Sequence, residues 1–162
     1  MQTQTEQLKG FKSAPTPENT RAIPGAVFHF LAKSDETGGR HALIKIIVQR
    51  GAEPPAHTHS REDESYFIIK GSVRYTIGED QVTVNEGEYV YLPKDLPHSF
   101  QVLSDKAEVL MWMSPGGLDQ WFWDNSVPAP DGKPLPIPNG PPPPDVIQHF
   151  VTSLESYGVK MV

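Results

Sequence analysis

The chain has 162 residues, of which 37% are hydrophobic, and 20 acidic side chains against 14 basic ones give a net charge of −6. This size suits one globular domain, and the acidic balance argues against nucleic acid or an anionic membrane as a partner. Because the sequence contains no cysteine, disulfides, thiolate metal sites and a cysteine nucleophile are excluded. The start of the chain lacks the basic and apolar segments of a signal peptide, and no apolar stretch is long enough for a membrane span. We therefore expect a cytoplasmic protein.

Residues 1–22 are polar and contain Pro15 and Pro17. Such a composition predicts an N-terminal arm that is held loosely, as a disordered tail. The alternatives are a strand at the edge of a sheet and an arm exchanged with a second copy of the chain.

Residues 23–114 predict β-structure. The segment 42–49 is rich in β-branched residues, and the segment 72–77 alternates strictly, with Val73, Tyr75 and Ile77 on one face. Further short strands are expected over residues 65–69, 82–84, 89–92, 99–103 and 107–113. Short strands that are separated by turns, with no helices between them, indicate an all-β sandwich or barrel.

Residues 115–162 have a different pattern. A short helix is expected at residues 119–123, whose aromatic side chains favour packing on the barrel or a dimer contact over substrate stacking. Nine of the seventeen prolines then fall within residues 128–144, which predicts an extended strap. Asp145 is a candidate N-cap for a final helix, and Gly158 can end that helix. We expect the strap and this helix, with its apolar face, to pack on the barrel.

Four polar side chains form the most informative pattern in the sequence. His57 and His59 are two positions apart, so on a strand they project from the same face with Cα atoms about 6.6 Å apart. Glu64 follows a short bend, and its carboxylate can reach the same point if the next strand pairs beside the first. His98 lies at the start of a later strand and would supply a third imidazole.

Three neutral imidazoles and one carboxylate suit a divalent first-row transition metal better than calcium or magnesium. Iron, nickel, manganese, cobalt, copper and zinc all accept this ligand set, so the sequence leaves the identity of the metal open. The alternative for each histidine is an exposed or structurally bonded side chain, and Glu64 could be a surface carboxylate. His29, His41 and His149 have no partners at ligand spacing and are expected to be structural or exposed.

The segment from Gly51 to Gly71 resembles the first motif of the cupin superfamily, G-x5-H-x-H-x4-E-x6-G, at every fixed position. The second motif, G-x5-P-x-G-x2-H-x3-N, is similar to the segment that starts at Gly87 and contains His98. There Asp95 replaces a turn glycine and Val102 replaces the asparagine. Asp95 can still adopt turn geometry.

The resemblance implies a double-stranded β-helix barrel, or jelly roll, over residues 23–114, with a metal inside one mouth and a short C-terminal helical tail. It also implies a homodimer. Residues 114–122 and 155–159 resemble the tail of single-domain cupins that are likened to quercetin 2,3-dioxygenases. In such enzymes the glutamate that matches Glu64 can bind the metal and also take the hydroxyl proton of the substrate.

Three functions are compatible with this pattern. The first is a metal-dependent dioxygenase that acts on a phenolic or enolic, flavonol-like small molecule. The second is a metal-dependent isomerase or lyase that acts on a small oxo-acid or sugar. The third is a non-catalytic module that binds a small molecule, because one fold hosts many roles.

Overall fold

A computed structural model describes residues 8–162 of the chain, so the first seven residues of the expected N-terminal arm lie outside the described residues. The elements, in chain order, are β1 (Thr20–Ile23), β2 (Ala26–Ala32), β3 (Ala42–Gln49), β4 (His57–His59), β5 (Asp63–Lys70), β6 (Ser72–Ile77), β7 (Asp80–Asn85), β8 (Tyr89–Leu92), β9 (His98–Val102), β10 (Lys106–Ser114), α1 (Leu118–Asp124), β11 (Val127–Pro128), α2 (Pro144–Ser156) and β12 (Val159–Met161).

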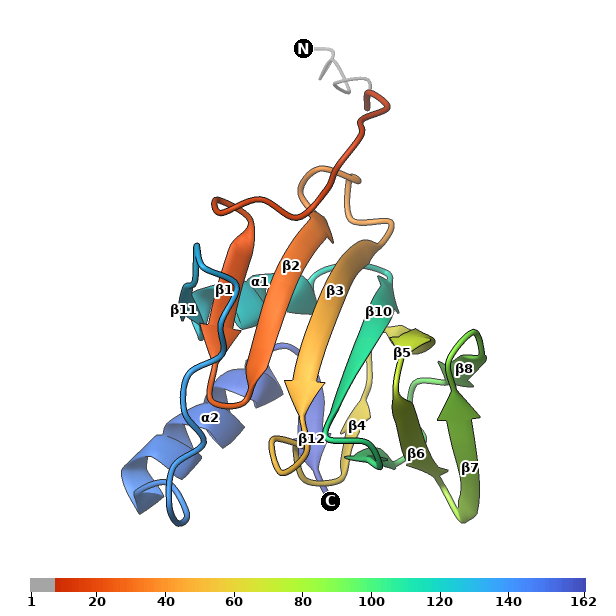
Figure 1. Cartoon of the computed structure of the whole chain (residues 1–162). Coiled ribbons are helices and arrows are strands. Elements are labelled where there is room, and N and C mark those ends of the chain that lie inside the picture. Colours follow the sequence, from red (N-terminus) through yellow and green to blue (C-terminus); the bar gives the residue numbers. More distant parts are fainter. Residues whose placement is uncertain (1–7) are drawn as a thin grey trace.

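The strands form two antiparallel sheets (Figure 1). One sheet has seven strands in the order β11-β1-β2-β3-β10-β5-β8, and the other has five in the order β12-β4-β9-β6-β7. The order jumps along the sequence in both sheets, as it does in jelly rolls, where successive strands change sheets. The predicted all-β jelly-roll barrel with a short C-terminal helix is therefore confirmed.

The hydrophobic core lies between the inner faces of the two sheets. On β3 and β10 every second side chain is buried and the intervening ones are half-buried or exposed. This alternation has the period of two that a strand imposes, and β-branched residues fill three of the four inner positions of β3. The buried inner residues of these two strands are Ala42, Ile44, Ile46, Val48, Ala107, Val109, Met111 and Met113.

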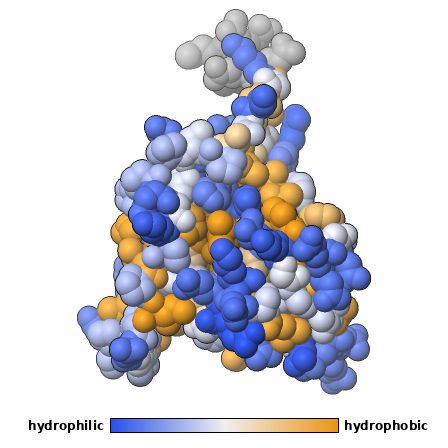
Figure 2. Space-filling model, in the orientation of Figure 1, coloured by the Kyte–Doolittle hydropathy of each residue, from blue (hydrophilic) through white to orange (hydrophobic). Residues whose placement is uncertain are grey.

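The outer face of the seven-stranded sheet also carries apolar side chains, which we call the outer apolar band. Leu110 pairs with Phe67, and Phe67 pairs with Tyr89, so these three side chains form a row across β10, β5 and β8. Figure 2 shows hydrophobic residues interspersed with hydrophilic ones over the sheet that lies toward the viewer in Figure 1. The members of the band are Leu43, Phe67, Tyr89, Tyr91, Leu110 and Trp112.

Helix α1 packs its aromatic side chains on the barrel. The ring of Phe122 lies 5.3 Å from that of Phe28, and the ring of Trp123 lies 5.0 Å from that of Phe30. The indole Nε1–H of Trp121 donates a hydrogen bond to Ser153 Oγ on α2 at 2.9 Å. Of the roles expected for this aromatic cluster, the structure therefore shows packing between the tail and the barrel.

The chain beyond α1 differs from the expectation in two respects. Asp145 does not cap α2, because the helix begins at Pro144 and Pro143 occupies the N-cap position. Val146 and Ile147 of the predicted apolar face are 40% and 45% exposed, so the first turn of α2 does not cover the core. Proline at the first helical position explains the earlier start, since its fixed φ suits a helix and its missing N–H is not needed there.

Both ends of the described chain contribute strands to the sheets. Strand β1 begins at Thr20, within the range expected as an arm, and pairs with β2. Strand β12 pairs with β4, so that Val159 lies opposite His59. Gly158, which precedes β12, has a φ of 86°, a backbone conformation that suits glycine after a helix. No helix within residues 8–162 is long and apolar enough to cross a membrane.

Gly71 joins β5 to β6 with a φ of +94°, and a Cβ atom there would lie 2.8 Å from the carbonyl oxygen of Lys106 and 2.6 Å from Ser104 Oγ. We expect Gly71→Ala to lower the free energy of unfolding by about 2–4 kcal/mol, because it adds steric overlap to the cost of a positive φ. Gly87→Ala is the matched control, since Gly87 has a φ of +82° with no atom within 4 Å of the added Cβ. Urea denaturation measures both losses, and equal losses would contradict the close approach at Gly71.

Candidate metal centre

The five-stranded sheet positions the three histidines. His57 and His59 lie on β4, and His98 is the first residue of the neighbouring β9. The backbones of His57 and His98 pair directly, so their side chains leave the sheet side by side. The spacing of His57 and His59 had predicted that their side chains share a face, and their ring centroids lie 4.9 Å apart.

Glu64 reaches this group from the opposite sheet. The sequence predicts that Glu64 reaches the histidines if β5 pairs beside β4. Instead, β5 pairs with β10 and β8. The bend at residues 60–62 carries the chain from one sheet to the other. Within its sheet Glu64 lies between Leu92 and Met113, whose side chains are buried. The four candidate ligands therefore meet across the barrel interior.

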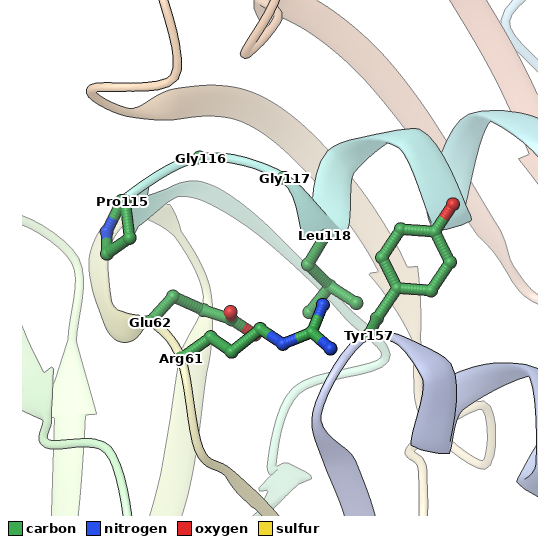
Figure 3. A pocket seen from close by; sticks show the side chains of 7 residues that line it. All are labelled: Arg61, Glu62, Pro115, Gly116, Gly117, Leu118 and Tyr157. Atoms are coloured by element: carbon green, nitrogen blue, oxygen red, sulfur yellow. The ribbon is translucent and has the colours of Figure 1, made fainter.

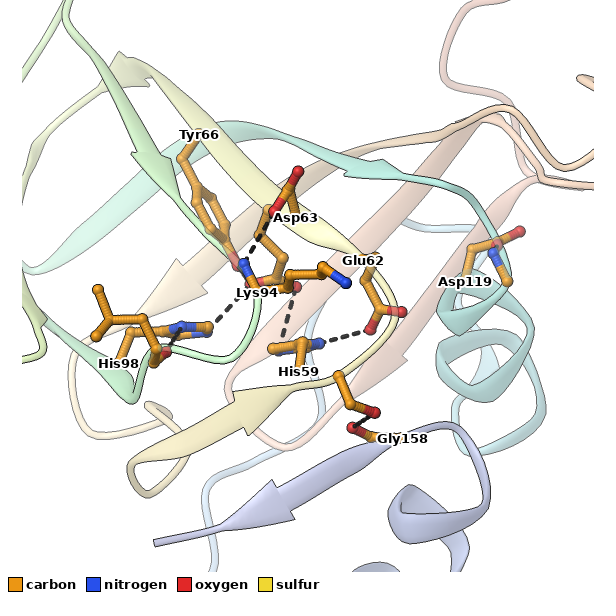
Figure 4. Close-up of polar contacts among 12 residues, drawn as sticks. His59, Glu62, Asp63, Tyr66, Lys94, His98, Asp119 and Gly158 are labelled. Carbon is orange, nitrogen blue, oxygen red and sulfur yellow. Dashed lines mark hydrogen bonds and ion pairs between the residues drawn. The ribbon is translucent and has the colours of Figure 1, made fainter.

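The structure brings His57, His59, Glu64 and His98 together. One ligand atom from each of these side chains lies within 4.8 Å of the others, an arrangement that could hold a metal ion. His59 Nε2 lies 3.7 Å from Glu64 Oε1, and His98 Nε2 lies 3.6 Å from Glu64 Oε2 (Figure 4). His59, Glu64 and His98 are buried, whereas His57 is half-buried.

Hydrogen bonds fix the tautomer of each imidazole. The Nδ1–H of His57 donates to the carbonyl oxygen of Pro55 at 2.9 Å, and the Nδ1–H of His98 donates to that of Leu96 at 3.1 Å. The Nδ1–H of His59 donates to Glu62 Oε1 at 2.6 Å. Since these acceptors require a proton on Nδ1, each neutral ring keeps a lone pair on Nε2. Three such lone pairs are what a divalent cation needs from imidazole.

Two of these Nε2 atoms have no hydrogen-bond partner within residues 8–162. The Nε2 atoms of His59 and His98 are buried and make no hydrogen bond to any described residue. A buried polar atom without a partner costs free energy, so such atoms call for an explanation. A cation between them and Glu64 would satisfy both, and the residues present therefore fit a metal of the imidazole-binding class.

The electrostatics of the cluster favour an anionic Glu64. Burial raises the pKa of Glu64, but the imidazoles of His98, His59 and His57 outweigh burial and lower this pKa to about 2. Burial lowers the pKa of His57, which keeps this imidazole neutral. Burial also lowers the pKa of His59, but the carboxylates of Glu62 and Glu64 outweigh it and raise this pKa. The cluster thus presents one carboxylate with full charge to a cation.

Two further side chains contact the candidate ligands. The hydroxyl of Tyr66 donates a hydrogen bond to Glu64 Oε2 at 3.1 Å, and burial, with the neighbouring Glu64, raises the pKa of Tyr66 well above 10, so this hydroxyl stays protonated. Glu62 accepts the bond from His59. Strand alternation places Tyr66 on the face of Glu64, two positions away, and this signal could have identified it. Glu62 lies in the bend between β4 and β5, where side chains do not alternate between two faces as they do in a strand. The sequence therefore offered no comparable signal for it.

Asp95 and the three remaining histidines lie outside the cluster. Asp95, at the position of a motif glycine, has a φ of 63°, and its backbone N–H donates to the carbonyl oxygen of His59 at 2.7 Å. This confirms that aspartate adopts the turn geometry there. His29 is buried and shares a 2.8 Å hydrogen bond with Thr20 Oγ1, His41 is half-buried and His149 is exposed, so none of them joins the cluster.

The chain is similar to several known proteins. An uncharacterized protein of Streptomyces coelicolor is 29% identical over 108 residues, which cover 67% of this chain and 97% of that protein. Oxalate decarboxylase of Bacillus subtilis is 33% identical over 84 residues, which cover 49% of this chain and 22% of that enzyme. Quercetin 2,3-dioxygenase of the same organism is a more distant relative, 20% identical over 54% of this chain and 26% of that enzyme. The chain therefore spans about a quarter of the length of the two enzymes.

Solved structures share the fold. KdgF from Halomonas sp. superposes with a TM-score of 0.53 at 20% identity, over 60% of this chain and 86% of that one. A variant of oxalate decarboxylase from Bacillus subtilis superposes with a TM-score of 0.55 at 28% identity, over 67% of this chain and 31% of that one. Residues 45–114 match the family model described as the cupin domain. This match runs from β3 to β10 and therefore includes all four candidate ligands.

Proposed function

We propose that the chain is a metal-dependent enzyme whose centre is formed by His57, His59, Glu64 and His98. One observation carries this proposal: three imidazoles and one carboxylate place ligand atoms within 4.8 Å of one another inside an apolar barrel. Burying polar atoms that lack a hydrogen bond, such as Nε2 of His59 and of His98, lowers the stability of the fold unless a further group binds them. A single divalent ion of iron, nickel, manganese, cobalt, copper or zinc fits this ligand set.

Metal binding should stabilise the fold. We expect a divalent metal at about 100 times its dissociation constant to add about 2.7 kcal/mol to the free energy of unfolding, because the ligands converge only in the folded chain. Differential scanning fluorimetry with metal and with chelator measures the shift in Tm. His98→Ala should lose most of this shift, and His149→Ala, on the exposed face of α2, should keep it. An equal Tm in metal and in chelator would contradict the proposed centre.

The activity that we propose is dioxygenation of a phenolic or enolic small molecule. When bound, the metal supplies Lewis acidity toward the substrate and, if it is redox-active, exchanges electrons in the reaction with O2. Glu64 takes the hydroxyl proton of the substrate, and the hydroxyl of Tyr66 stabilises the charge on Oε2 from 3.1 Å. The apolar core around the cluster excludes bulk water.

Oxygen consumption tests this activity. We expect the purified, metal-loaded chain to consume one O2 for each molecule of a flavonol or diketone, because both oxygen atoms enter the product. Removing a metal ligand in His57→Ala should lower the rate by at least about 100-fold, more than changes outside the ligand sphere usually do. His149→Ala should retain the full rate. Uptake by the unmodified chain that does not exceed that of His57→Ala would remove this activity for the substrates tested.

A lyase acting on a small oxo-acid is the second candidate. The similarity to oxalate decarboxylase, at 33% identity over 84 residues, favours it over other reactions without net oxygen uptake. The same four side chains would hold the metal, which would bind the carboxylate of the substrate as a Lewis acid. Turnover that persists when oxygen is removed distinguishes this candidate from a dioxygenase.

We also propose that two copies of the chain associate through the outer apolar band. Phe67, Tyr89 and Tyr91 are 36%, 59% and 49% exposed there, and aromatic side chains are enriched in protein interfaces. A net charge of −6 opposes self-association unless the contact face is neutral. Lys45 and Glu108 form an ion pair of 3.2 Å on this face, beside Leu110, and thus neutralise its centre. The band therefore suits a second copy of the same sheet.

Light scattering after size-exclusion chromatography tests the dimer. We expect twice the chain mass of 18.0 kDa. Leu110→Glu places a charge in the centre of the band and should raise the dissociation constant at least about 30-fold, the equivalent of the 2 kcal/mol that defines an interface hot spot. Val82→Glu on β7 is the matched control, because Val82 is 42% exposed on the other sheet. A monomeric unmodified chain, or equal effects of the two substitutions, would contradict this interface.

A further inference from the structure

Glu62 is a buried carboxylate that the cupin motif leaves unspecified. It lies in the bend between β4 and β5 and is only 3% exposed. Its Oε1 lies 2.6 Å from His59 Nδ1, and this is its one hydrogen bond or ion pair within residues 8–162. The neighbouring Arg61 does not pair with it, because the guanidinium donates to the carbonyl oxygen of Ser156. Since burying a carboxylate is costly, a single contact with one histidine calls for a function.

The three imidazoles differ in what lies behind them. His57 and His98 donate their Nδ1–H to neutral backbone carbonyls, at 2.9 Å and 3.1 Å. His59 donates to a side-chain carboxylate, that of Glu62, through a shorter bond of 2.6 Å (Figure 4). A carboxylate behind a metal-binding imidazole fixes the orientation of the ring and increases the electron density on the far nitrogen. His59 is thus distinguished from the other two as the strongest donor of the set.

We propose that Glu62 is a positioning residue that acts through Nδ1 of His59 to orient this imidazole and to strengthen its bond to the metal. The inference rests on the proposed metal centre. The carboxylate of Glu62 makes no hydrogen bond or ion pair with another candidate ligand within residues 8–162, and Glu62 is not one of the four side chains whose ligand atoms converge. Its charge, rather than its size, carries the effect.

The space around Glu62 allows its charge to be removed by substitution without a change in how the side chain packs. One side of the carboxylate borders a cavity of about 200 Å³, whose wall also includes Leu118 and Tyr157 (Figure 3). An amide of the same shape fits this space without steric overlap. Glu62→Gln therefore removes the charge while the fold is retained, and Glu62→Asp keeps the charge on a shorter side chain.

Binding of Co²⁺ tests the inference without any substrate. We expect Glu62→Gln to weaken Co²⁺ binding by about 10–100-fold in competition with a chelating dye, the effect typical of partners behind a ligating histidine. The visible ligand-field spectrum of the bound ion should also shift, because one imidazole is a weaker and less oriented donor. The Tm of the metal-free chain should change little. Glu62→Asp should recover part of the affinity, which a purely steric role would not explain.

Asp63→Asn is the matched control. Asp63 is the next carboxylate along the chain, and it accepts a hydrogen bond from the backbone N–H of Lys94 at 2.9 Å rather than from a histidine. We expect this variant to bind Co²⁺ as the unmodified chain does. If the unmodified chain binds Co²⁺ and Glu62→Gln has the same affinity and spectrum, the inference is wrong while the metal centre stands. An unmodified chain that binds no Co²⁺ would overturn both. Should Glu62→Gln fail to fold, Glu62→Asp decides: a lowered Co²⁺ affinity with a shifted spectrum supports the inference, and the affinity and spectrum of the unmodified chain contradict it.

Discussion

The structure depends on the enclosure of three imidazoles and one carboxylate within an otherwise apolar barrel. His59, Glu64 and His98 are almost fully buried, and transfer of such groups from water is unfavourable unless each finds a partner. On one side the Nδ1–H bonds meet this requirement and orient the rings. On the other side the Nε2 atoms point at one another and at a carboxylate. A cation is the kind of group that completes such an arrangement.

Both sheets contribute side chains to this cluster. The five-stranded sheet supplies all three histidines from two neighbouring strands, and the seven-stranded sheet supplies Glu64 from across the interior. The distance between the sheets is set by the core residues packed between them, such as Ile44, Tyr75 and Met111. The geometry at the cluster is therefore coupled to the packing of the whole barrel, since close-packed interiors transmit small changes in volume.

Much of the fold and of the candidate site could be predicted from the sequence, since the positions concerned are governed by local periodicity. The alternation on β3 and β10 and the spacing of His57 and His59 need no knowledge of distant residues. The approach of Glu64 from the opposite sheet could not be predicted, because strand pairing is a long-range property. Nor could β12, whose three residues carry too little pattern, or the role of Glu62, which lies in a bend.

Strand β12 ties formation of the cluster to a segment far along the chain. The hydroxyl of Ser60 donates to the carbonyl oxygen of Gly158, 98 positions away, and His57 and His59 pair with Met161 and Val159. Against β9, in contrast, β4 has a single paired position. During vectorial synthesis the two histidines would emerge long before the strand that secures them. The four candidate ligands would then reach their final arrangement only after residues 159–161 have paired with β4, because that pairing joins segments far apart in the sequence.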